Sequence, residues 1–414
     1  MKCWTTGAGA LMLSAVTGLA LAAAPDNRVL AAAQASRTEQ LQLLKALVNI
    51  DSGTGDAIGA HRVEAVLVPR LKVLGAKIEI VPAEAPGLGT NLVATFNGTG
   101  KTRILMIGHI DTVFGPGTVA KRPYRVEGDR GRGPGVSDEK GGVVEGLYAL
   151  KTLHDLGIKS YGRISFLMES SEERGSPGTR NLIKKLVADS DVELNLEPGD
   201  PPDALTVWRK GSATFHIDVQ GRAAHAGVNP QDGRNAAIEL IHQLSGLEAF
   251  PHSGAGTTVN LTVMQAGTRN NIIPDAASAQ INVRVLDVAE FDRVEGQLRK
   301  NAETVLIPDT TVTVSREPAF PPLPINPGTD ALAARASAIY VSLGKTLVMT
   351  GNGGASESAL AASMGIPALD GLGPVGGNFH SDGEYLDLNS VTPRLYLLTM
   401  LLMDLSQNPP AAAK

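Results

Sequence analysis

The stretch RILMIGHIDT, residues 103–112, joins a continuous apolar run to a histidine and an aspartate. The run predicts a buried strand over residues 103–110, of the kind found in parallel sheets. His109 and Asp111 then fall at the C-terminal end of that strand. Open α/β sheets bind their ligands at this edge, so the stretch indicates both a fold class and the place of a site.

Helical and strand patterns alternate on both sides of this stretch. Residues 36–39, Ser-Arg-Thr-Glu, form a capping box that predicts the start of a first helix. The β-α-β rhythm predicts an α/β domain with a mostly parallel sheet flanked by helices, made by residues 36–210 and 323–414. The other expected elements are helices at 58–74, 141–156, 181–187 and 393–405, and strands at 164–168, 192–196, 347–349 and 366–369.

A different rhythm occupies residues 211–322. The order β-α-β-β-α-β is expected there, which matches the ferredoxin-like split motif. We therefore expect an inserted α+β domain, with hinges near residues 209–211 and 321–322 that let it close over the first domain. Its expected elements lie at 214–219, 236–247, 258–264, 279–286, 291–304 and 311–314.

Composition and the N-terminus bear on compartment and partners. The chain has 414 residues, a net charge of -5 and no basic stripe, so nucleic acid is not an expected partner. Residues 1–22 indicate an export signal, because Lys2 precedes a short apolar segment at 8–21. A membrane anchor is the alternative, but no stop-transfer pattern follows. Since the only cysteine, Cys3, lies in this signal, we expect an exported protein, periplasmic or secreted, without disulfides or thiolate ligands.

Acidic and histidine side chains gather where expected strands end or helices begin. Imidazole and carboxylate groups without cysteine suit zinc or a similar divalent ion. Each residue alone has a simpler reading, such as a strand-end pair, a helix cap, a solvated carboxylate or a loop histidine. Their common position at one edge of one domain favours a metal site. The set consists of His109, Asp111, Asp138, Glu172, Glu173, Glu197 and His380.

Spacing suggests roles for several of these residues. Residues i and i+2 of a strand point to the same side, so Asp111 can accept the second ring N–H of His109. Asp138, at an expected helix N-terminus, can bridge two metals. Of the adjacent Glu172 and Glu173, one can bind metal while the other acts as a general base toward water.

In their order along the chain, these motifs resemble the dizinc exopeptidases, which include aminoacylases, desuccinylases and bacterial glutamate carboxypeptidases. The resemblance is closest to the secreted, folate-hydrolysing glutamate carboxypeptidase type and extends over residues 47–396. Four motifs carry it: His-x-Asp-Thr-Val at 109–113, Gly-Pro-Gly-x-x-Asp-x-Lys-Gly-Gly at 133–142, Glu-Glu-x-Gly-Ser at 172–176 and Phe-His-Ser at 379–381.

The resemblance implies two zinc ions per chain. Asp111 would orient His109, and Glu172 would be the general base that activates the bridging water and later protonates the leaving amine. The implied ligands are His109 and Glu197 for one zinc, Glu173 and His380 for the other, and Asp138 between the two.

The inserted domain shares the resemblance, which implies a homodimer formed through it. His225 would enter the active site of the partner subunit and stabilise the oxyanion, although a turn histidine is the simpler reading. Asn271 would contact substrate. Arg284 would bind the free carboxylate of the substrate, for which a guanidinium is well suited, whereas a surface arginine is the alternative.

Two departures from the glutamate carboxypeptidase type concern substrate selection rather than metal binding. Glu317 stands where that type carries an arginine before Pro-Ala-Phe, which puts acceptance of an acidic side chain in question. A shifted Arg316 is the alternative source of positive charge. Residues 353–357, Gly-Gly-Ala-Ser-Glu, replace the usual Gly-Gly-Thr-Asp.

These observations predict a zinc-dependent carboxypeptidase that hydrolyses an amide bond and releases a C-terminal amino acid, with glutamate favoured. The substrate would be a small peptide or an N-acyl amino acid. An N-acyl amino acid amidohydrolase or a dipeptidase of the same family is the first alternative. A secreted metal-binding module without catalysis is the second, and the presence of Glu172 with all five ligand candidates argues against it.

Overall fold

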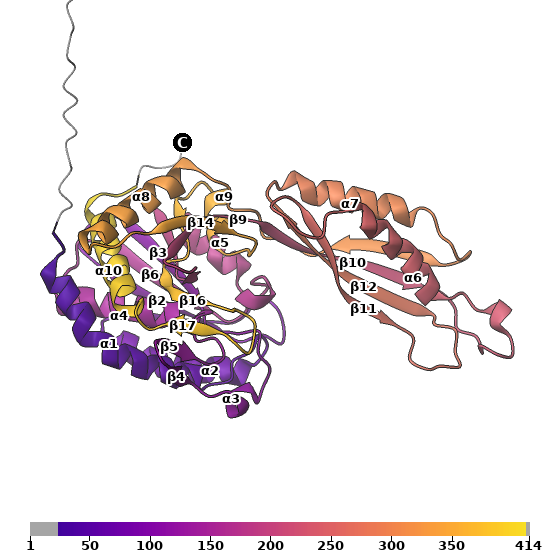
Figure 1. The fold of residues 1–414 in the computed structure, drawn as a ribbon, viewed down its shortest axis with the longest axis horizontal. Coiled ribbons are helices and arrows are strands. Elements are labelled where there is room, and N and C mark those ends of the chain that lie inside the picture. The colour runs from indigo at the N-terminus through magenta and orange to yellow at the C-terminus, as the bar shows by residue number, and fades with distance from the viewer. Residues whose placement is uncertain (1–23, 411–414) are drawn as a thin grey trace, which may run out of the picture.

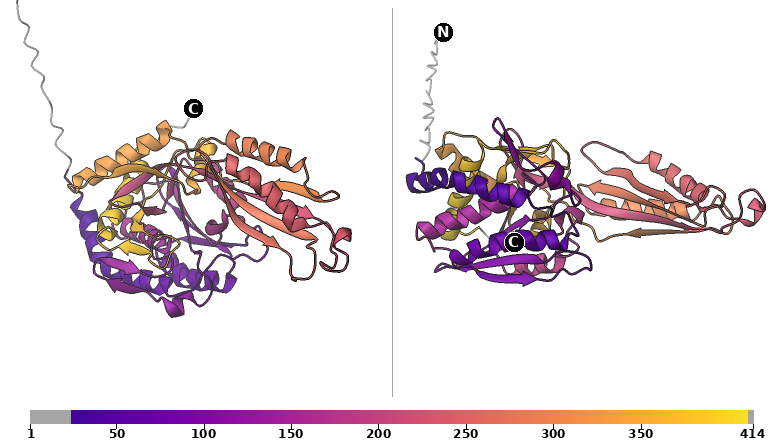
Figure 2. Two further views of the ribbon diagram at one scale, coloured as in Figure 1. Left: turned by 45° about the vertical axis from the view of Figure 1, so that its right-hand side comes forward. Right: turned by 90° about the horizontal axis from the view of Figure 1, so that it is seen from below.

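In the computed structural model, which describes residues 24–410, the chain forms two lobes of unequal size (Figure 1). The larger lobe contains both ends of the described chain, and a middle segment forms the smaller lobe. A narrow neck of strands joins the lobes in Figure 1, and Figure 2 shows both lobes from two further sides. The expected signal at 1–22 lies outside the described residues. Among the residues that are described, no helix is both long and apolar enough to cross a membrane.

A six-stranded sheet lies at the centre of the larger lobe, in the order β1-β2-β6-β3-β7-β15. β3 pairs in parallel with β6 and β7, and β7 pairs in parallel with β15, whereas β2 is antiparallel to both of its neighbours. The expected mostly parallel sheet is confirmed, with one reversed strand. Its strands are β1 (Lys77–Val81), β2 (Asn91–Asn97), β3 (Arg103–His109), β6 (Arg163–Glu169), β7 (Val192–Asn195) and β15 (Ala368–Leu369).

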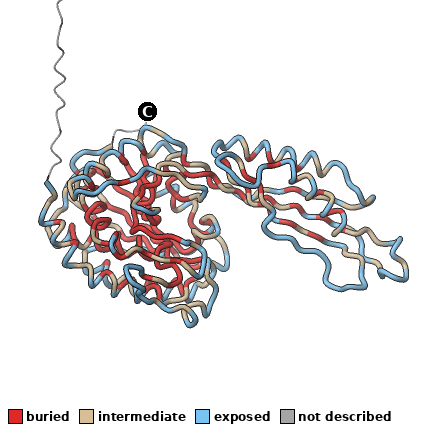
Figure 3. Tube along the Cα trace, viewed as in Figure 1, coloured by how far each residue is buried: buried red, intermediate tan, exposed pale blue. Residues whose placement is uncertain are grey.

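Helices cover both faces of this sheet. Side chains of β3 alternate between two apolar cores, with Ile104 and Met106 in one and Leu105 and Ile107 in the other. The buried interior of the larger lobe is visible in Figure 3. The first core includes residues of α1 (Asn27–Val48), α2 (Ala57–Val73), α4 (Lys140–Asp155), α8 (Pro327–Ser342) and α10 (Val391–Gln407), and the second includes residues of α5 (Arg180–Ala188) and α9 (Ser358–Ser363).

The first helix begins earlier than the capping box predicted. α1 starts at Asn27, where the carboxylate of Asp26 accepts a hydrogen bond from the backbone N–H of Arg28 at 2.9 Å. Ser36 lies inside the helix and donates its hydroxyl proton to the carbonyl oxygen of Ala33 at 3.2 Å. The prediction was wrong because an aspartate cap upstream is followed by a helical sequence that runs through the capping box without a break.

The smaller lobe is an antiparallel sheet, in the order β11-β12-β10-β13, with two helices on one face. Residues of β10 alternate between this apolar core and the open face of the sheet. The order along the chain is β-α-β-β-α-β, as expected. Its elements are β10 (Gly211–Gln220), α6 (Ala236–Ser245), β11 (Thr258–Ala266), β12 (Ala276–Val285), α7 (Ala289–Ala302) and β13 (Thr311–Arg316).

The neck between the lobes is made of extended chain. β9 (Ala204–Arg209) leads directly into β10. β14 (Val348–Asn352) pairs with β9 in parallel. The chain returns through Phe320 and Leu323, which form isolated bridges with Ser212 and Arg209. Short elements complete the larger lobe: α3 (Thr118–Lys121), β4 (Arg125–Glu127), β5 (Arg130–Arg132), β8 (Pro198–Gly199), β16 (Gly373–Gly377) and β17 (Tyr385–Asp387).

Candidate active site

Three neighbouring strands of the large sheet end beside one another and place the candidate residues. β3 ends at His109, and a short 3-10 turn after β6, Glu172–Arg174, carries the two adjacent glutamates. Glu197 lies two residues after the end of β7. Because β3 is parallel to β6 and β7, their carboxyl ends meet at one edge of the sheet.

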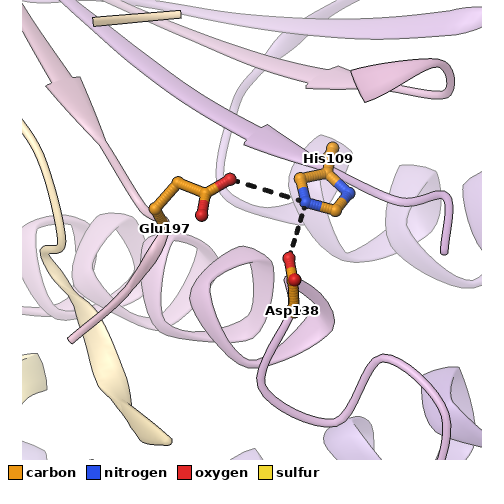
Figure 4. A group of neighbouring side chains, drawn as sticks. All are labelled: His109, Asp138 and Glu197. Atoms are coloured by element: carbon orange, nitrogen blue, oxygen red, sulfur yellow. Dashed lines mark hydrogen bonds and ion pairs between the residues drawn. The ribbon is translucent and has the colours of Figure 1, made fainter. Parts of the chain in front are cut away.

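His109 faces two carboxylates from other segments (Figure 4). Its Nε2 lies 3.1 Å from Oδ1 of Asp138 and 3.7 Å from Oε1 of Glu197. Asp138 comes from the glycine-rich turn before α4, and Glu197 from the loop after β7. All three residues are buried, so this group is largely removed from bulk water.

Asp138 also faces a second histidine. Its Oδ2 lies 3.2 Å from Nε2 of His380, which in turn is 3.1 Å from Oε2 of Glu173. His380 comes from the loop between β16 and β17, far along the chain. The two oxygens of Asp138 therefore point toward two different histidines, each of which has a further carboxylate beside it.

This set of side chains fits a pair of divalent cations. His109, Asp138 and Glu197 offer atoms within 4.8 Å of one another, and so do Asp138, Glu173 and His380. Imidazole nitrogens and carboxylate oxygens are ligands that zinc accepts. Carboxylates gathered this closely also repel one another, and cations between them would remove that repulsion.

Asp111 contacts both halves of the cluster. Nδ1 of His109 lies 3.1 Å from the carbonyl oxygen of Asp111 and 3.4 Å from its Oδ1. The Asp111 carboxylate also accepts hydrogen bonds from the backbone N–H groups of Glu172 at 3.2 Å and Glu173 at 3.4 Å, and from the Thr54 hydroxyl at 2.6 Å. The imidazole is thereby held with Nε2 toward the cluster, and the two glutamates are tied to the same carboxylate.

Glu172 lies beside the candidate ligands. Its Oε2 is 3.9 Å from Nε2 of His109, and it forms a further group of close carboxylates with Glu197 and Glu357. Burial, and after it the carboxylate of Glu357, raises the pKa of Glu172 well above its usual range. A carboxyl group with a raised pKa is suited to accepting and returning a proton near neutral pH.

Two charged side chains that support the cluster were not singled out as site residues from the sequence. Nη2 of Arg209 lies 2.6 Å from Oδ1 of Asp370 and 3.6 Å from Oε2 of Glu197. Glu384 accepts hydrogen bonds from three backbone N–H groups of the glycine-rich turn, that of Asp138 at 3.2 Å included. Burial raises the pKa of Glu384 to about 7. Neither side chain lies in a recognisable motif. Each contacts a segment that is distant along the chain, and such contacts leave no local pattern in the sequence.

A cleft of about 510 Å³ opens over the cluster, between the two lobes. Nη1 of Arg284 donates a hydrogen bond to the carbonyl oxygen of Gly353 at 3.3 Å, which joins the smaller lobe to the larger across this cleft. The lining includes Asp138, Glu172, Glu173, Glu197 and His380 from the larger lobe, and Arg284 and Glu317 from the smaller lobe and its return segment.

His225 and Asn271 are not among the cleft-lining side chains of residues 24–410. His225 is exposed, and its Nδ1 accepts hydrogen bonds from the backbone N–H groups of Gly227 and Val228, each at 3.1 Å. Asn271 is also exposed, and its carbonyl oxygen accepts a hydrogen bond from a neighbouring loop. Within a single chain, neither residue lies at the cluster.

The alternative that Arg316 supplies positive charge to the cleft is wrong. Its guanidinium lies 2.9 Å from Oδ1 of Asp292 and 3.2 Å from Oε2 of Glu295, both on α7. Since successive side chains of a strand point to opposite faces, Arg316 faces the helices while Glu317 lines the cleft.

Zinc is expected to stabilise the protein more strongly as the pH rises from about 6 to 8. Hydrogen bonds with Asp138 and Glu173 raise the pKa of His380 to about 10 in the metal-free chain, so this proton must leave before a metal binds. A group with a raised folded pKa gives stability that is present below its unfolded pKa and is lost as the pH rises through the folded one. The free energy of unfolding of the metal-free form should therefore fall as the pH rises, while the affinity for zinc rises. The measurement is the difference in Tm between the zinc-loaded and the metal-free protein at several pH values from about 6 to 8. A Tm difference that stays constant or shrinks as the pH rises would contradict this expectation.

Comparison with known proteins gives consistent matches. A model of peptidase family M20/M25/M40 matches residues 105–404. The chain is 35% identical over 404 residues to Carboxypeptidase G2 of Pseudomonas sp. (strain RS-16), and the match covers 97% of each chain. It is 28% identical over 369 residues to Succinyl-diaminopimelate desuccinylase of Gluconacetobacter diazotrophicus, and this match covers 84% of this chain and 92% of that one.

Solved structures match the fold. The M20 family metallo-carboxypeptidase Sso-CP2 from Sulfolobus solfataricus superposes with a TM-score of 0.71 at 18% identity, over 88% of this chain and 98% of that one. The dipeptidase Dug1p from Saccharomyces cerevisiae gives a TM-score of 0.73 at 14% identity, over 92% of this chain and 98% of that one. At these identities the likeness concerns the two-lobed fold.

Proposed function

The chain belongs to peptidase family M20/M25/M40, and from this we propose that it is a zinc-dependent carboxypeptidase. It hydrolyses an amide bond beside a free carboxylate and releases a C-terminal amino acid. The observation that carries the proposal is the position of Asp138 between two histidines, with Glu172 nearby and Arg284 lining the same cleft.

Two zinc ions are held by the two groups of side chains that share Asp138. His109 and Glu197 bind one ion, and Glu173 and His380 bind the other. When bound, the ions supply Lewis acidity toward the amide carbonyl and lower the pKa of water. Burial of most of these ligands keeps competing water away from the reacting atoms.

Glu172 is the proton carrier. Its raised pKa suits a group that takes a proton from the attacking water and returns it to the nitrogen of the leaving amine. Arg284 binds the α-carboxylate of the amino acid to be released. Its Nε donates to Oδ1 of Asn282 at 2.9 Å, which holds the guanidinium in place toward the cleft.

Hydrolysis of matched amides tests this function. The zinc-loaded protein should cleave N-benzoyl amino acids with a free carboxylate at least about tenfold faster, in kcat/KM, than the same compounds with the carboxylate blocked as a methylamide. Arg284→Ala should remove most of this difference, whereas Arg299→Ala, exposed on α7, should keep it. A chelator should abolish all turnover.

A wider panel, with acetyl and succinyl amino acids, N-blocked dipeptides and dipeptides with a free amine, separates the family alternatives. The desuccinylase relative makes an N-acyl amino acid amidohydrolase the second candidate, which predicts faster cleavage of acetyl or succinyl amino acids than of N-blocked dipeptides. Preferred cleavage of dipeptides with a free amine would indicate a dipeptidase. Equal cleavage of free and blocked carboxylates would contradict the carboxypeptidase.

The active protein is a homodimer that places His225 of each subunit at the cluster of the other. The exposed position of His225 outside its own cleft supports this, as does the apolar surface of the edge strand β11, where Leu261, Val263 and Met264 are 44%, 38% and 43% exposed. Asn271 contacts substrate from the segment paired with that of His225. The mass of the zinc-loaded protein in solution distinguishes a dimer from a monomer.

Export to the periplasm or the medium is the proposed localisation. Its support is the N-terminal pattern of Lys2 followed by the apolar segment 8–21. N-terminal sequencing of the protein from its native host tests this, since an intact Met1 on active protein would contradict cleavage near residue 22.

A further inference from the structure

The open face of the smaller sheet presents polar side chains to the cleft in regular register. Arg284 on β12 lies opposite Ser212 on β10, and Asn282 lies opposite Thr214. The backbone N–H of Glu317 donates to the carbonyl oxygen of Thr214 at 2.9 Å, which continues the row beyond β13. All five residues line the cleft.

Arg284 lies on one side of β10, opposite Ser212, and Glu317 lies on the other side, opposite Thr214. The two residues are therefore separated by two strand spacings across the sheet and by two residues along it. Strand spacing and residue rise place their Cα atoms about 12 Å from each other. Both side chains line the same cleft, so a molecule with a charged group at each end can lie between them. Arg284 is thus placed for one end of such a molecule and Glu317 for the other.

The carboxylate of Glu317 is open to a ligand. Its Oε1 lies 2.9 Å from Nε2 of His216, and its side chain is 55% exposed. Among residues 24–410 no hydrogen bond engages its Oε2. One carboxylate oxygen therefore remains to accept a hydrogen bond from a bound cation.

Two arginines of the larger lobe, Arg174 and Arg180, line the same cleft as Glu317. Arg180 donates to the carbonyl oxygens of Gly175 at 2.8 Å and Pro318 at 2.7 Å, and its guanidinium lies over the ring of Phe320. Arg174 also lines a second hollow, together with Glu173. Neither arginine forms an ion pair with Glu317 among residues 24–410, so an acidic side chain placed beside Glu317 would meet an unneutralised like charge there.

We infer that this end of the cleft selects an amino acid with a cationic side chain, such as lysine or arginine, in place of the glutamate expected from the resemblance. The inference rests on the proposed function, which puts the α-carboxylate at Arg284. Glu317 then accepts the ammonium or guanidinium group, and His216 holds the carboxylate in position. A glutamate substrate would bring two carboxylates together at the same place.

The test compares N-benzoyl-lysine, N-benzoyl-norleucine and N-benzoyl-glutamate on the zinc-loaded full chain. The lysine compound should exceed the glutamate compound at least about tenfold in kcat/KM, because a charge-assisted hydrogen bond contributes about that factor. Glu317→Gln should bring lysine down to the level of norleucine, and Glu317→Arg should shift the preference to glutamate. The matched control Glu303→Gln, exposed at the end of α7, should keep the ratio of the unaltered protein.

Binding of free amino acids gives an independent readout. L-lysine should raise the Tm of the zinc-loaded protein more than L-glutamate does, and Glu317→Gln should remove that difference. A preference for glutamate that Glu317→Gln leaves unchanged would overturn the inference while the carboxypeptidase stands. If no amide is cleaved, the proposed function fails, and the Tm comparison still decides whether Glu317 binds a cation.

Discussion

Replacing Glu172 by glutamine is expected to lower kcat by about 10³-fold or more while the protein keeps its zinc. The amide of glutamine has nearly the shape of the carboxylate but cannot take a proton from water. The candidate ligands His109, Asp138 and Glu197 remain in place, because none of them depends on the Glu172 carboxylate for a hydrogen bond. Turnover of the best amide from the panel and zinc content of the same sample give the two readouts.

The control for this variant is Glu303→Gln, which makes the same chemical change on the surface and should leave both readouts as in the unaltered protein. A Glu172→Gln protein with full zinc and a rate within a few-fold of the unaltered chain would contradict the role of Glu172. Loss of zinc together with loss of rate would instead make Glu172 a ligand, which its place in a carboxylate group with Glu197 and Glu357 permits.

Replacing His225 by alanine is expected to lower kcat by about 10²-fold to 10³-fold, the range for loss of one oxyanion donor. This effect would be notable because His225 is exposed and lies outside the cleft of its own chain. In the proposed homodimer, a second subunit brings it to the cluster. KM should change much less than kcat, since an oxyanion donor acts on the transition state.

Mixing the two inactive variants tests the exchange of His225 directly. A dimer of one Glu172→Gln chain and one His225→Ala chain contains one intact site, made by Glu172 of one subunit and His225 of the other. Random reassociation should restore about a quarter of the activity of the unaltered protein. Mixed dimers that are shown to form yet remain inactive would contradict the shared site, and so would a fully active monomer.

The larger sheet was predictable where strands are buried on both faces. Residues 103–110 form a continuous apolar run, and β3 follows it closely at Arg103–His109. The reversed strand β2 was not predicted, because the direction of a strand depends on which neighbours it pairs with and leaves no mark in its own pattern. The start of α1 was missed because the capping box at 36–39 lies inside a helix that already begins after Asp26.

The candidate ligands could be predicted from the sequence, whereas the charged side chains that hold them in place could not. His109, Asp138 and His380 stand in recognisable motifs, and the structure brings their ring and carboxylate atoms within hydrogen-bonding distance. Arg209 and Glu384 gave no such signal, because an ion pair with Asp370 and hydrogen bonds to a distant turn exist only once the chain has folded. That Glu317 faces the cleft also required the strand register of the folded protein.

Zinc content of the purified chain is the most direct test of the central claim, that Asp138 joins two metal sites. After removal of metal and reconstitution with zinc, elemental analysis should find about two zinc ions per chain, and Asp138→Ala should lose both. One tightly held ion in the unaltered chain, or two ions retained in Asp138→Ala, would contradict an arrangement in which this carboxylate serves both histidines.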